Sequence, residues 1–252
     1  MSLTQKTAQL VARLGEIASE HRPVALANSL SIEDMVLTHL ILENKIPVEI
    51  FSLDTGRLHE ETLKVIDDVR ERYGYRIAVY YPDAEELQAY VANNGVNGFY
   101  NSVEQRKGCC HVRKVRPLQR ALKGKQAWIT GMRRSHGETR TDLQEKQWDS
   151  GNGLWKYNPL ADWQEKEIWQ LIRDNQIPYN SLYDKHYASI GCQPCTRSIT
   201  MGEDVRAGRW WWEDPQNKEC GLHVEATPIS ILPADDSPAE VGQRSYDGGD
   251  QG

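Results

Sequence analysis

The chain has 252 residues, enough for a full hydrophobic core, and a formal net charge of −6 at pH 7. This charge excludes general nucleic-acid binding, so an anion site needs a local cluster of cations. The N-terminal apolar residues have helical spacing with glutamates between them, so we expect no signal peptide and no membrane span there. Five cysteines without a secretory signal indicate a reducing compartment, and we expect a cytoplasmic protein.

Short β-rich runs alternate with helical patterns along the first half of the chain. The runs predict strands at 24–28, 48–53, 76–81 and 127–130. The helical patterns predict helices at 32–43, 59–73, 84–93, 110–122 and 162–175. This alternation predicts an α/β fold, a mostly parallel sheet flanked by helices that binds its ligands beyond the carboxyl ends of the strands.

The composition changes near the C-terminus. From about Glu225 the chain becomes rich in Pro, Gly, Ser and Asp, so we expect a disordered tail over 225–252. We expect residues 1–224 to form one domain.

Four of the five cysteines form two close pairs, Cys109 with Cys110 and Cys192 with Cys195. Four soft thiolates suit either zinc or an iron–sulfur cluster. Neighbouring side chains on a helix diverge by about 100°, which fits separate corners of a [4Fe-4S] cube better than one small ion. The alternatives are a zinc site and buried structural thiols.

The fifth cysteine, Cys220, lies between Lys218 and His223. Nearby cations would favour the thiolate form of Cys220, which suits a nucleophile. The alternative is an incidental thiol with no role in chemistry. No sixth cysteine remains to resolve an adduct on Cys220, so a nucleophilic role would require an external dithiol.

Three polar loops follow predicted strands. Residues 28–34 precede a helix and suit phosphate binding, although Ser31 and Asp34 also fit a helix-capping box. Leu53-Asp54-Thr55-Gly56 fits a binding loop or a common turn. Residues 131–140 are basic and flexible in composition, which suits a lid over an anion or a solvated loop.

Three further cations are candidates. Lys114 lies four residues after Cys110, so a regular helix would place it one turn along on the same side. There it would stabilise both a thiolate cluster and an anionic ligand. Arg206 and Arg209 precede three tryptophans, a mixture that fits packing as well as ligand binding.

Six segments carry a combined pattern in a fixed order. They are Ser-Leu-Asp-Thr-Gly-Arg-Leu-His59, Cys109-Cys110-x-x-Arg-Lys114, Gly131-x-Arg-Arg134, Ile190-Gly-Cys-x-Pro-Cys-Thr-Arg197, Gly208-Arg-Trp-Trp-Trp-Glu213 and Lys218-Glu-Cys-Gly-Leu-His223. Together they resemble the assimilatory sulfonucleotide reductases, specifically the iron–sulfur adenylyl-sulfate (APS) reductases. The resemblance spans nearly all of residues 24–223.

The resemblance implies a fold, a cofactor and a reaction. The fold is the adenine nucleotide α-hydrolase-like sheet, and a [4Fe-4S] cluster is ligated by Cys109, Cys110, Cys192 and Cys195. Cys220 attacks the sulfur of APS, displaces AMP and becomes an S-sulfocysteine. Thioredoxin or glutaredoxin then releases sulfite, in sulfate assimilation and cysteine biosynthesis. We expect the cluster to act structurally and electrostatically.

The resemblance also implies which residues form the site. Lys114 lies near the cluster and the substrate, and we expect His223 to orient or tune Cys220. The implied substrate-binding residues are Ser29, Ser31, Asp34, Leu53, Asp54, Thr55, Gly56, Arg133, Arg134, Arg140, Arg206 and Arg209. Relatives are commonly homo-oligomers, so we expect one here.

Two departures and three alternatives remain. The first loop has Leu30-Ser31 where many relatives carry glycine, and 29 residues follow His223. One alternative substrate is the 3′-phosphorylated form, PAPS, alone or together with APS. An ATP-splitting ligase or a tRNA-thiolating enzyme would need a glycine-rich loop that residues 28–34 lack. A zinc-stabilised nucleotide-binding protein is the third.

Overall fold

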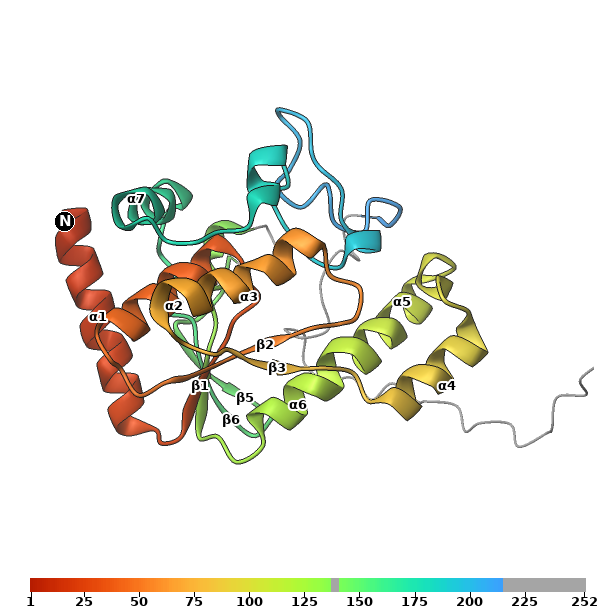
Figure 1. Ribbon diagram of the computed structural model, residues 1–252, viewed down its shortest axis with the longest axis horizontal. Coiled ribbons are helices and arrows are strands. Elements are labelled where there is room, and N and C mark those ends of the chain that lie inside the picture. The colour runs from red at the N-terminus through yellow and green to blue at the C-terminus, as the bar shows by residue number, and fades with distance from the viewer. Residues whose placement is uncertain (137–140, 215–252) are drawn as a thin grey trace, which may run out of the picture.

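A computed structural model of the chain describes residues 1–136 and 141–214 (Figure 1). Its centre is a six-stranded sheet with the order β3-β2-β1-β4-β6-β5. The strands are β1 Val24–Ala27, β2 Glu49–Leu53, β3 Ala78–Tyr80, β4 Ala127–Ile129, β5 Lys146–Asp149 and β6 Leu154–Tyr157. Neighbouring strands are parallel except β5 and β6, which pair antiparallel at one edge.

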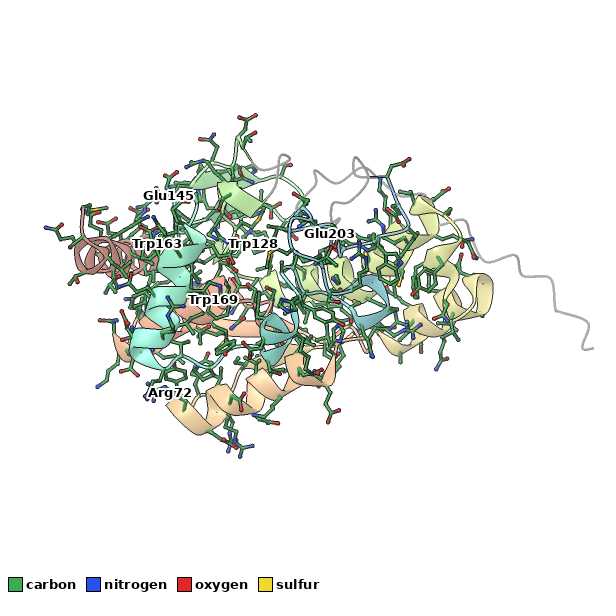
Figure 2. All side chains as sticks on the ribbon, turned by 90° about the horizontal axis from the view of Figure 1, so that it is seen from above. Arg72, Trp128, Glu145, Trp163, Trp169 and Glu203 are labelled. Carbon is green, nitrogen blue, oxygen red and sulfur yellow. The ribbon has the colours of Figure 1, made fainter. Side chains whose placement is uncertain are left out.

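Seven α-helices accompany the sheet in the described part of the chain. They are α1 Leu3–Glu20, α2 Ile32–Glu43, α3 Glu60–Tyr73, α4 Ala84–Asn94, α5 Val103–Cys110, α6 Arg116–Leu122 and α7 Glu165–Asn175. A π-helical segment, His111–Val115, joins α5 to α6. The ends of the molecule's long axis are occupied by α1 and α4 (Figures 1 and 2).

The helices cover both faces of the sheet. Helices α1, α2, α3 and α7 pack on one face, over alternate strand residues such as Val24 and Leu26. Helix α6 packs on the other face, where Ala25 joins Phe51 and Trp128. This period of two along β1 is the pattern of a strand buried on both sides.

Local signals fix several helix ends. The Ser2 hydroxyl accepts a hydrogen bond from the Gln5 backbone N–H, which completes a capping box on α1. The Asp83 side chain accepts from the backbone N–H groups of Glu85 and Glu86 at the start of α4. Gly74 takes the left-handed conformation that ends α3.

The predicted fold class is confirmed, and most predicted elements differ from the observed ones by a few residues at their ends. The prediction of one helix over 110–122 was wrong, because α-helix begins at Val103 and is interrupted by the π segment. The hairpin of β5 and β6 was not predicted. Within the described residues, no helix is long and apolar enough to cross a membrane. The predicted tail lies outside the described residues.

The strand order locates the site. Successive connections place β2 on one side of β1 and β4 on the other, so the chain reverses direction across the sheet between β1 and β4. In open α/β sheets, ligands bind at such a switch point, beyond the carboxyl ends of the strands.

Candidate functional site

A pocket of about 230 Å³ lies at this switch point. Its wall includes the loop after β1, the end of β2, the loop after β4 and the segment 188–209. Many of the predicted substrate-binding residues line it: Ser29, Ser31, Asp34, Leu53, Thr55, Arg133, Arg206 and Arg209, together with Lys114. The fold therefore gathers side chains from five separate stretches of the chain around one cavity.

The Asp34 carboxylate joins two walls of this pocket. Its Oδ2 accepts from the Ser29 backbone N–H at 2.8 Å, from the Ser29 hydroxyl at 2.6 Å and from the Ser31 hydroxyl at 3.4 Å. Its Oδ1 accepts from the Gly131 backbone N–H at 2.8 Å. One buried side chain thus ties the loop after β1 to the end of β4.

The capping-box interpretation of Ser31 and Asp34 was wrong. Ser31 occupies the N-cap position of α2, but its side chain accepts no hydrogen bond from the helix backbone. Its hydroxyl donates to Asp34 instead, because the carboxylate is directed back toward the loop.

Burial raises the pKa of Asp34 to about 6, with a further increase from the neighbouring Glu33 charge. Its hydrogen bonds from Ser29 and Gly131 oppose that rise by stabilising the carboxylate. Gly131 is required for this contact, because a Cβ there would lie 2.5 Å from Asp34 Oδ1.

Arg133 reaches the pocket as half of a buried ion pair. Its Nε and Nη2 lie 2.9 Å from Glu33 Oε1, and both side chains are about 4% exposed. Tyr183 lies nearby, and burial together with the Glu33 charge raises the pKa of its phenol. Glu33 and Tyr183 line the pocket but were not predicted; the only sequence signal for Glu33 was its position beside Asp34.

Arg209 lines the pocket from the segment 188–209. Its Nη1 donates to the Ile190 carbonyl at 3.2 Å, and its guanidinium lies against the backbone of Gly191. A Cβ at Gly191 would lie 2.4 Å from Arg209 Nη2, so the glycine permits this approach. Lys114, Arg206 and Arg209 all contribute positive charge to the pocket lining.

The remaining predicted residues lie elsewhere. Asp54 accepts from the Gly56 backbone N–H at 2.8 Å and so stabilises the turn after β2, and neither lines the pocket. Arg134 pairs with Asp162 and donates to the Leu143 carbonyl, also away from the pocket. Arg140, Cys220 and His223 lie outside the described residues.

A second cavity brings the four paired cysteines together. Cys109 and Cys110 from α5 face Cys192 and Cys195 across it, and all four are buried. Lys114 lines this cavity as well as the pocket at the switch point, so it stands between the two. In the described ranges, no group of three or more His, Cys, Asp or Glu residues is arranged to hold a metal ion.

The turn after β2 connects the two cavities. The Thr55 hydroxyl lies 3.2 Å from Cys192 Sγ, and the Thr55 carbonyl accepts from Arg113 Nη1 at 2.6 Å. The Arg57 carbonyl accepts from the Gln193 backbone N–H at 2.7 Å, which holds the turn that carries Cys192. Arg113 was not predicted, although it follows Cys110 by only three residues.

The buried thiols are surrounded by cations. Burial raises the pKa of Cys109, and Arg113 and Lys114 oppose that rise. Burial raises the pKa of Cys195 to about 12, opposed by Lys114 and Arg209. A bound positive centre would favour the thiolates further, since thiols bind metals in their deprotonated form.

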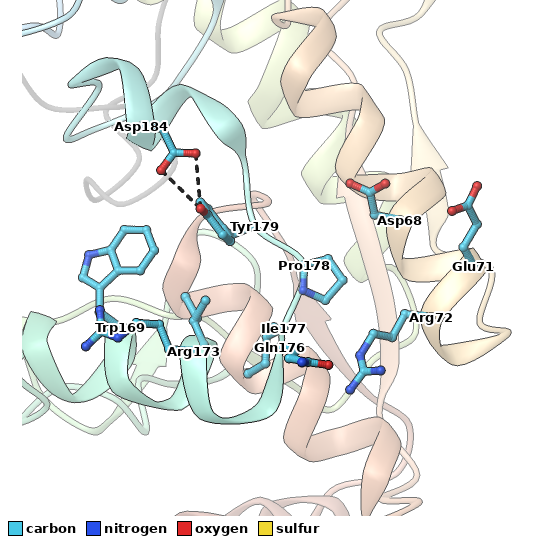
Figure 3. Close-up of a pocket in the computed structure, with 11 residues that line it drawn as sticks. Asp68, Glu71, Arg72, Trp169, Arg173, Gln176, Ile177, Pro178, Tyr179 and Asp184 are labelled. Carbon is cyan, nitrogen blue, oxygen red and sulfur yellow. Dashed lines mark hydrogen bonds between the residues drawn. The ribbon is translucent and has the colours of Figure 1, made fainter.

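A larger groove lies between α3 and α7, away from both cavities (Figure 3). Trp169, Pro178 and Tyr179 line it, and the Tyr179 hydroxyl donates to Asp184 at 3.2 Å. None of the predicted site residues within the described ranges lines this groove.

Relatives of the chain share much of its sequence. An adenosine 5′-phosphosulfate reductase of Burkholderia cepacia is 52% identical over 240 residues, covering 95% of this chain and 94% of that protein. A protein of the same name from Allochromatium vinosum is 51% identical over 222 residues, covering 88% and 87%.

Solved structures share the fold. A phosphoadenylyl-sulfate reductase from Candida auris gives a TM-score of 0.64 at 24% identity, covering 79% of this chain and 91% of that chain. The FMN adenylyltransferase of Candida glabrata gives 0.52 at 16% identity, covering 93% and 82%. These likenesses confirm the adenine nucleotide α-hydrolase-like sheet. Residues 23–198 match the family described as the phosphoadenosine phosphosulfate reductase domain, and the chain belongs to that family.

Proposed function

We propose that this protein reduces APS to sulfite and AMP in sulfate assimilation. The observation that carries the proposal is that Lys114 lines both the pocket at the switch point and the cavity of the four thiols. One cation can therefore serve a bound anion and a thiolate site together. The two relatives named as adenosine 5′-phosphosulfate reductases support the choice of substrate.

The nucleotide of APS would occupy the pocket between β1 and β4. Its phosphosulfate group is anionic, and Lys114, Arg206 and Arg209 supply positive charge to the pocket lining. Arg133 is already paired with Glu33, so the pair adds no net positive charge to the pocket. Arg133 would instead orient substrate groups that lie near Glu33. Arg134 and Arg140 remain proposed contacts of a basic loop over the substrate.

The cysteines fit a [4Fe-4S] cluster. Cys109, Cys110, Cys192 and Cys195 present four soft sulfur donors to one buried cavity, and Arg113 and Lys114 compensate negative charge there. When bound, the cluster supplies structural crosslinking and an electrostatic field, with its irons held by the thiolates. The Thr55 hydroxyl would hold the Cys192 sulfur in place.

The covalent step falls to Cys220. Its thiolate would form a bond to the sulfur of APS while the bond from that sulfur to the AMP phosphate oxygen breaks, and AMP leaves with the electron pair. We propose that His223 orients or tunes the thiol, and that Lys114, Arg206 and Arg209 stabilise the charge that develops on the leaving phosphate.

A reductant must complete the cycle. A dithiol of the thioredoxin or glutaredoxin class would attack Cys220 Sγ, release sulfite and form a mixed disulfide, which its second thiol resolves. The dithiol supplies the two electrons. We place this reaction in the cytoplasm. We also propose that residues 1–224 form one domain followed by a tail over 225–252, and that the protein is a homo-oligomer.

Substrate choice tests the proposal. Purified protein with thioredoxin, thioredoxin reductase and NADPH should release sulfite from APS far faster than from PAPS at equal concentrations. Iron and acid-labile sulfide should both be present at about four per chain, the composition of the proposed cluster. Preference for PAPS would refute the substrate, and zinc without iron or sulfide would refute the cofactor.

A further inference from the structure

Arg106 and Glu213 form a buried ion pair outside the residues assigned above. Arg106 Nε donates to Glu213 Oε1 at 3.0 Å, and Nη2 donates to Oε2 at 2.7 Å. The side chains are 0% and 3% exposed. Arg106 lies on α5 three residues before Cys109, so it shares a face of that helix with the cysteine and lines the four-thiol cavity.

Trp210 completes this contact. The Arg106 guanidinium lies 4.5 Å from the centroid of the Trp210 ring, and the Arg209 guanidinium is also 4.5 Å from it. The Trp210 backbone N–H donates to the Cys195 carbonyl at 3.1 Å. Trp210 has a φ of +41°, a conformation that a bulky residue keeps only when its surroundings hold it there.

Stability alone does not account for this pair. Well-packed apolar side chains of similar volume often stabilise a protein as much as a buried ion pair does. A bidentate arginine–carboxylate pair adds a fixed geometry that apolar contacts do not provide. The chain that follows Glu213 would need such a fixed starting point, because it carries the proposed nucleophile, Cys220.

We propose that Arg106 and Glu213 are positioning residues that anchor the Cys220-bearing segment to the helix of Cys109 and Cys110. This inference rests on the proposed role of Cys220. Cys220 lies seven positions after Glu213 in the sequence, a reach of at most ~25 Å for extended chain. The anchor limits the volume that the Cys220 thiol can search to that distance from Glu213, which raises its effective concentration at the substrate.

The test compares Glu213→Gln with a matched control, Glu203→Gln. Glu203, which Figure 2 labels, also pairs with an arginine of the same segment, Arg197, at 2.8 Å, but the two side chains are 31% and 39% exposed. With labelled APS and no reductant, the rate of adduct formation on Cys220 should fall at least tenfold in Glu213→Gln. AMP affinity and iron content should stay within twofold of wild type, and Glu203→Gln should match wild type throughout.

A second readout needs no catalysis. Trypsin cleavage after Lys218 should be at least fivefold faster in Glu213→Gln than in wild type and unchanged in Glu203→Gln. If Glu213→Gln does not fold, the double variant Arg106→Met, Glu213→Leu carries the same expectations, since it leaves no unpaired charge.

The outcomes separate the two proposals. If wild type forms no adduct on Cys220, the proposed function fails, and cleavage after Lys218 still tests the anchor. An adduct rate in Glu213→Gln equal to wild type overturns the anchor, as does cleavage that both glutamate variants accelerate equally. A parallel loss of AMP binding would assign Glu213 to general pocket structure and also overturn it.

Discussion

At the scale of single residues, the Asp34 carboxylate holds together the pocket at the switch point. It accepts hydrogen bonds from Ser29 and Ser31 on one strand end and from Gly131 on another. The sequence could identify Asp34 as a candidate site residue, because it lies just after a predicted strand and near the start of a helix. It could not identify Gly131 as the partner, since 97 residues separate the two.

The raised pKa of Asp34 predicts a pH dependence of stability. With a folded pKa of about 6 and an ordinary value of 3.8, the folded state binds a proton more tightly than the unfolded state. Stability contributed by this group therefore increases as pH falls through 6 and is lost as pH rises through it. Relative to Asp34→Asn, wild type should gain about 1 kcal/mol of unfolding free energy between pH 7 and pH 5.

Urea unfolding of both proteins at the two pH values measures this gain. Burial lowers the pKa of His39 and His59, which destabilises the protein on acidification. Both proteins share that contribution, so it cancels in the comparison. Parallel pH profiles for wild type and Asp34→Asn would contradict the account of Asp34.

Lys114 carries the second residue-scale prediction. Lys114→Ala removes the cation that lines both cavities, so adduct formation on Cys220 should slow by about a hundredfold. Iron content should persist, because all four thiols remain. Single-turnover kinetics with labelled APS measure the effect, with Lys107→Ala on the exposed side of α5 as the control. Equal rates in the two variants would exclude the bridging role.

At the scale of elements, the π segment His111–Val115 sets the direction of α5 relative to α6. Helix α6 is fixed by Leu118 and Leu122 against the sheet, whereas α5 carries Cys109 and Cys110. Such an interruption adds a residue to a helical turn and often lies at functional sites. It places the cysteines toward the 192–195 turn while α6 stays packed.

Deleting His111 tests this geometry. A regular helix would rotate α5 by about 100° relative to α6 and carry both cysteines away from Cys192 and Cys195. Iron and sulfide content should fall well below half of wild type, while circular dichroism keeps the helical signal. His111→Ala preserves the length and should load normally. Full loading of the deletion variant would show that the π segment does not orient the cysteines.

The sequence anticipated most elements but not these irregular ones. The short apolar run 24–28 and the apolar, helix-forming stretch 32–43 are local signals, and a strand and a helix formed where predicted. The residues of the π segment would suit a regular helix equally well, so they carry no local signal for it. The packing of α5 and α6 against different partners selects the π conformation. The β5–β6 hairpin was missed because Lys146 and Lys156 obscure the apolar alternation of its short strands.

At the scale of the whole molecule, the sheet order brings the site together. The pocket lies at the reversal between β1 and β4, and the segment 188–209 returns to line it. That segment carries Cys192, Cys195, Arg206 and Arg209, so two of the proposed cluster ligands and two of the proposed anion-binding cations lie on one stretch of chain. Motifs in the sequence could name these residues, but only the topology shows that Lys114 lies between the two cavities.

The proposed reaction depends most of all on Cys220 as the nucleophile. The most direct test is to incubate the iron-loaded protein with ³⁵S-labelled APS without thioredoxin, and to map the label by peptide mass spectrometry. We expect one sulfonate on Cys220, released as sulfite on addition of thioredoxin and absent in Cys220→Ser. An unmodified Cys220 in protein that still produces sulfite, or label on another residue, would contradict it.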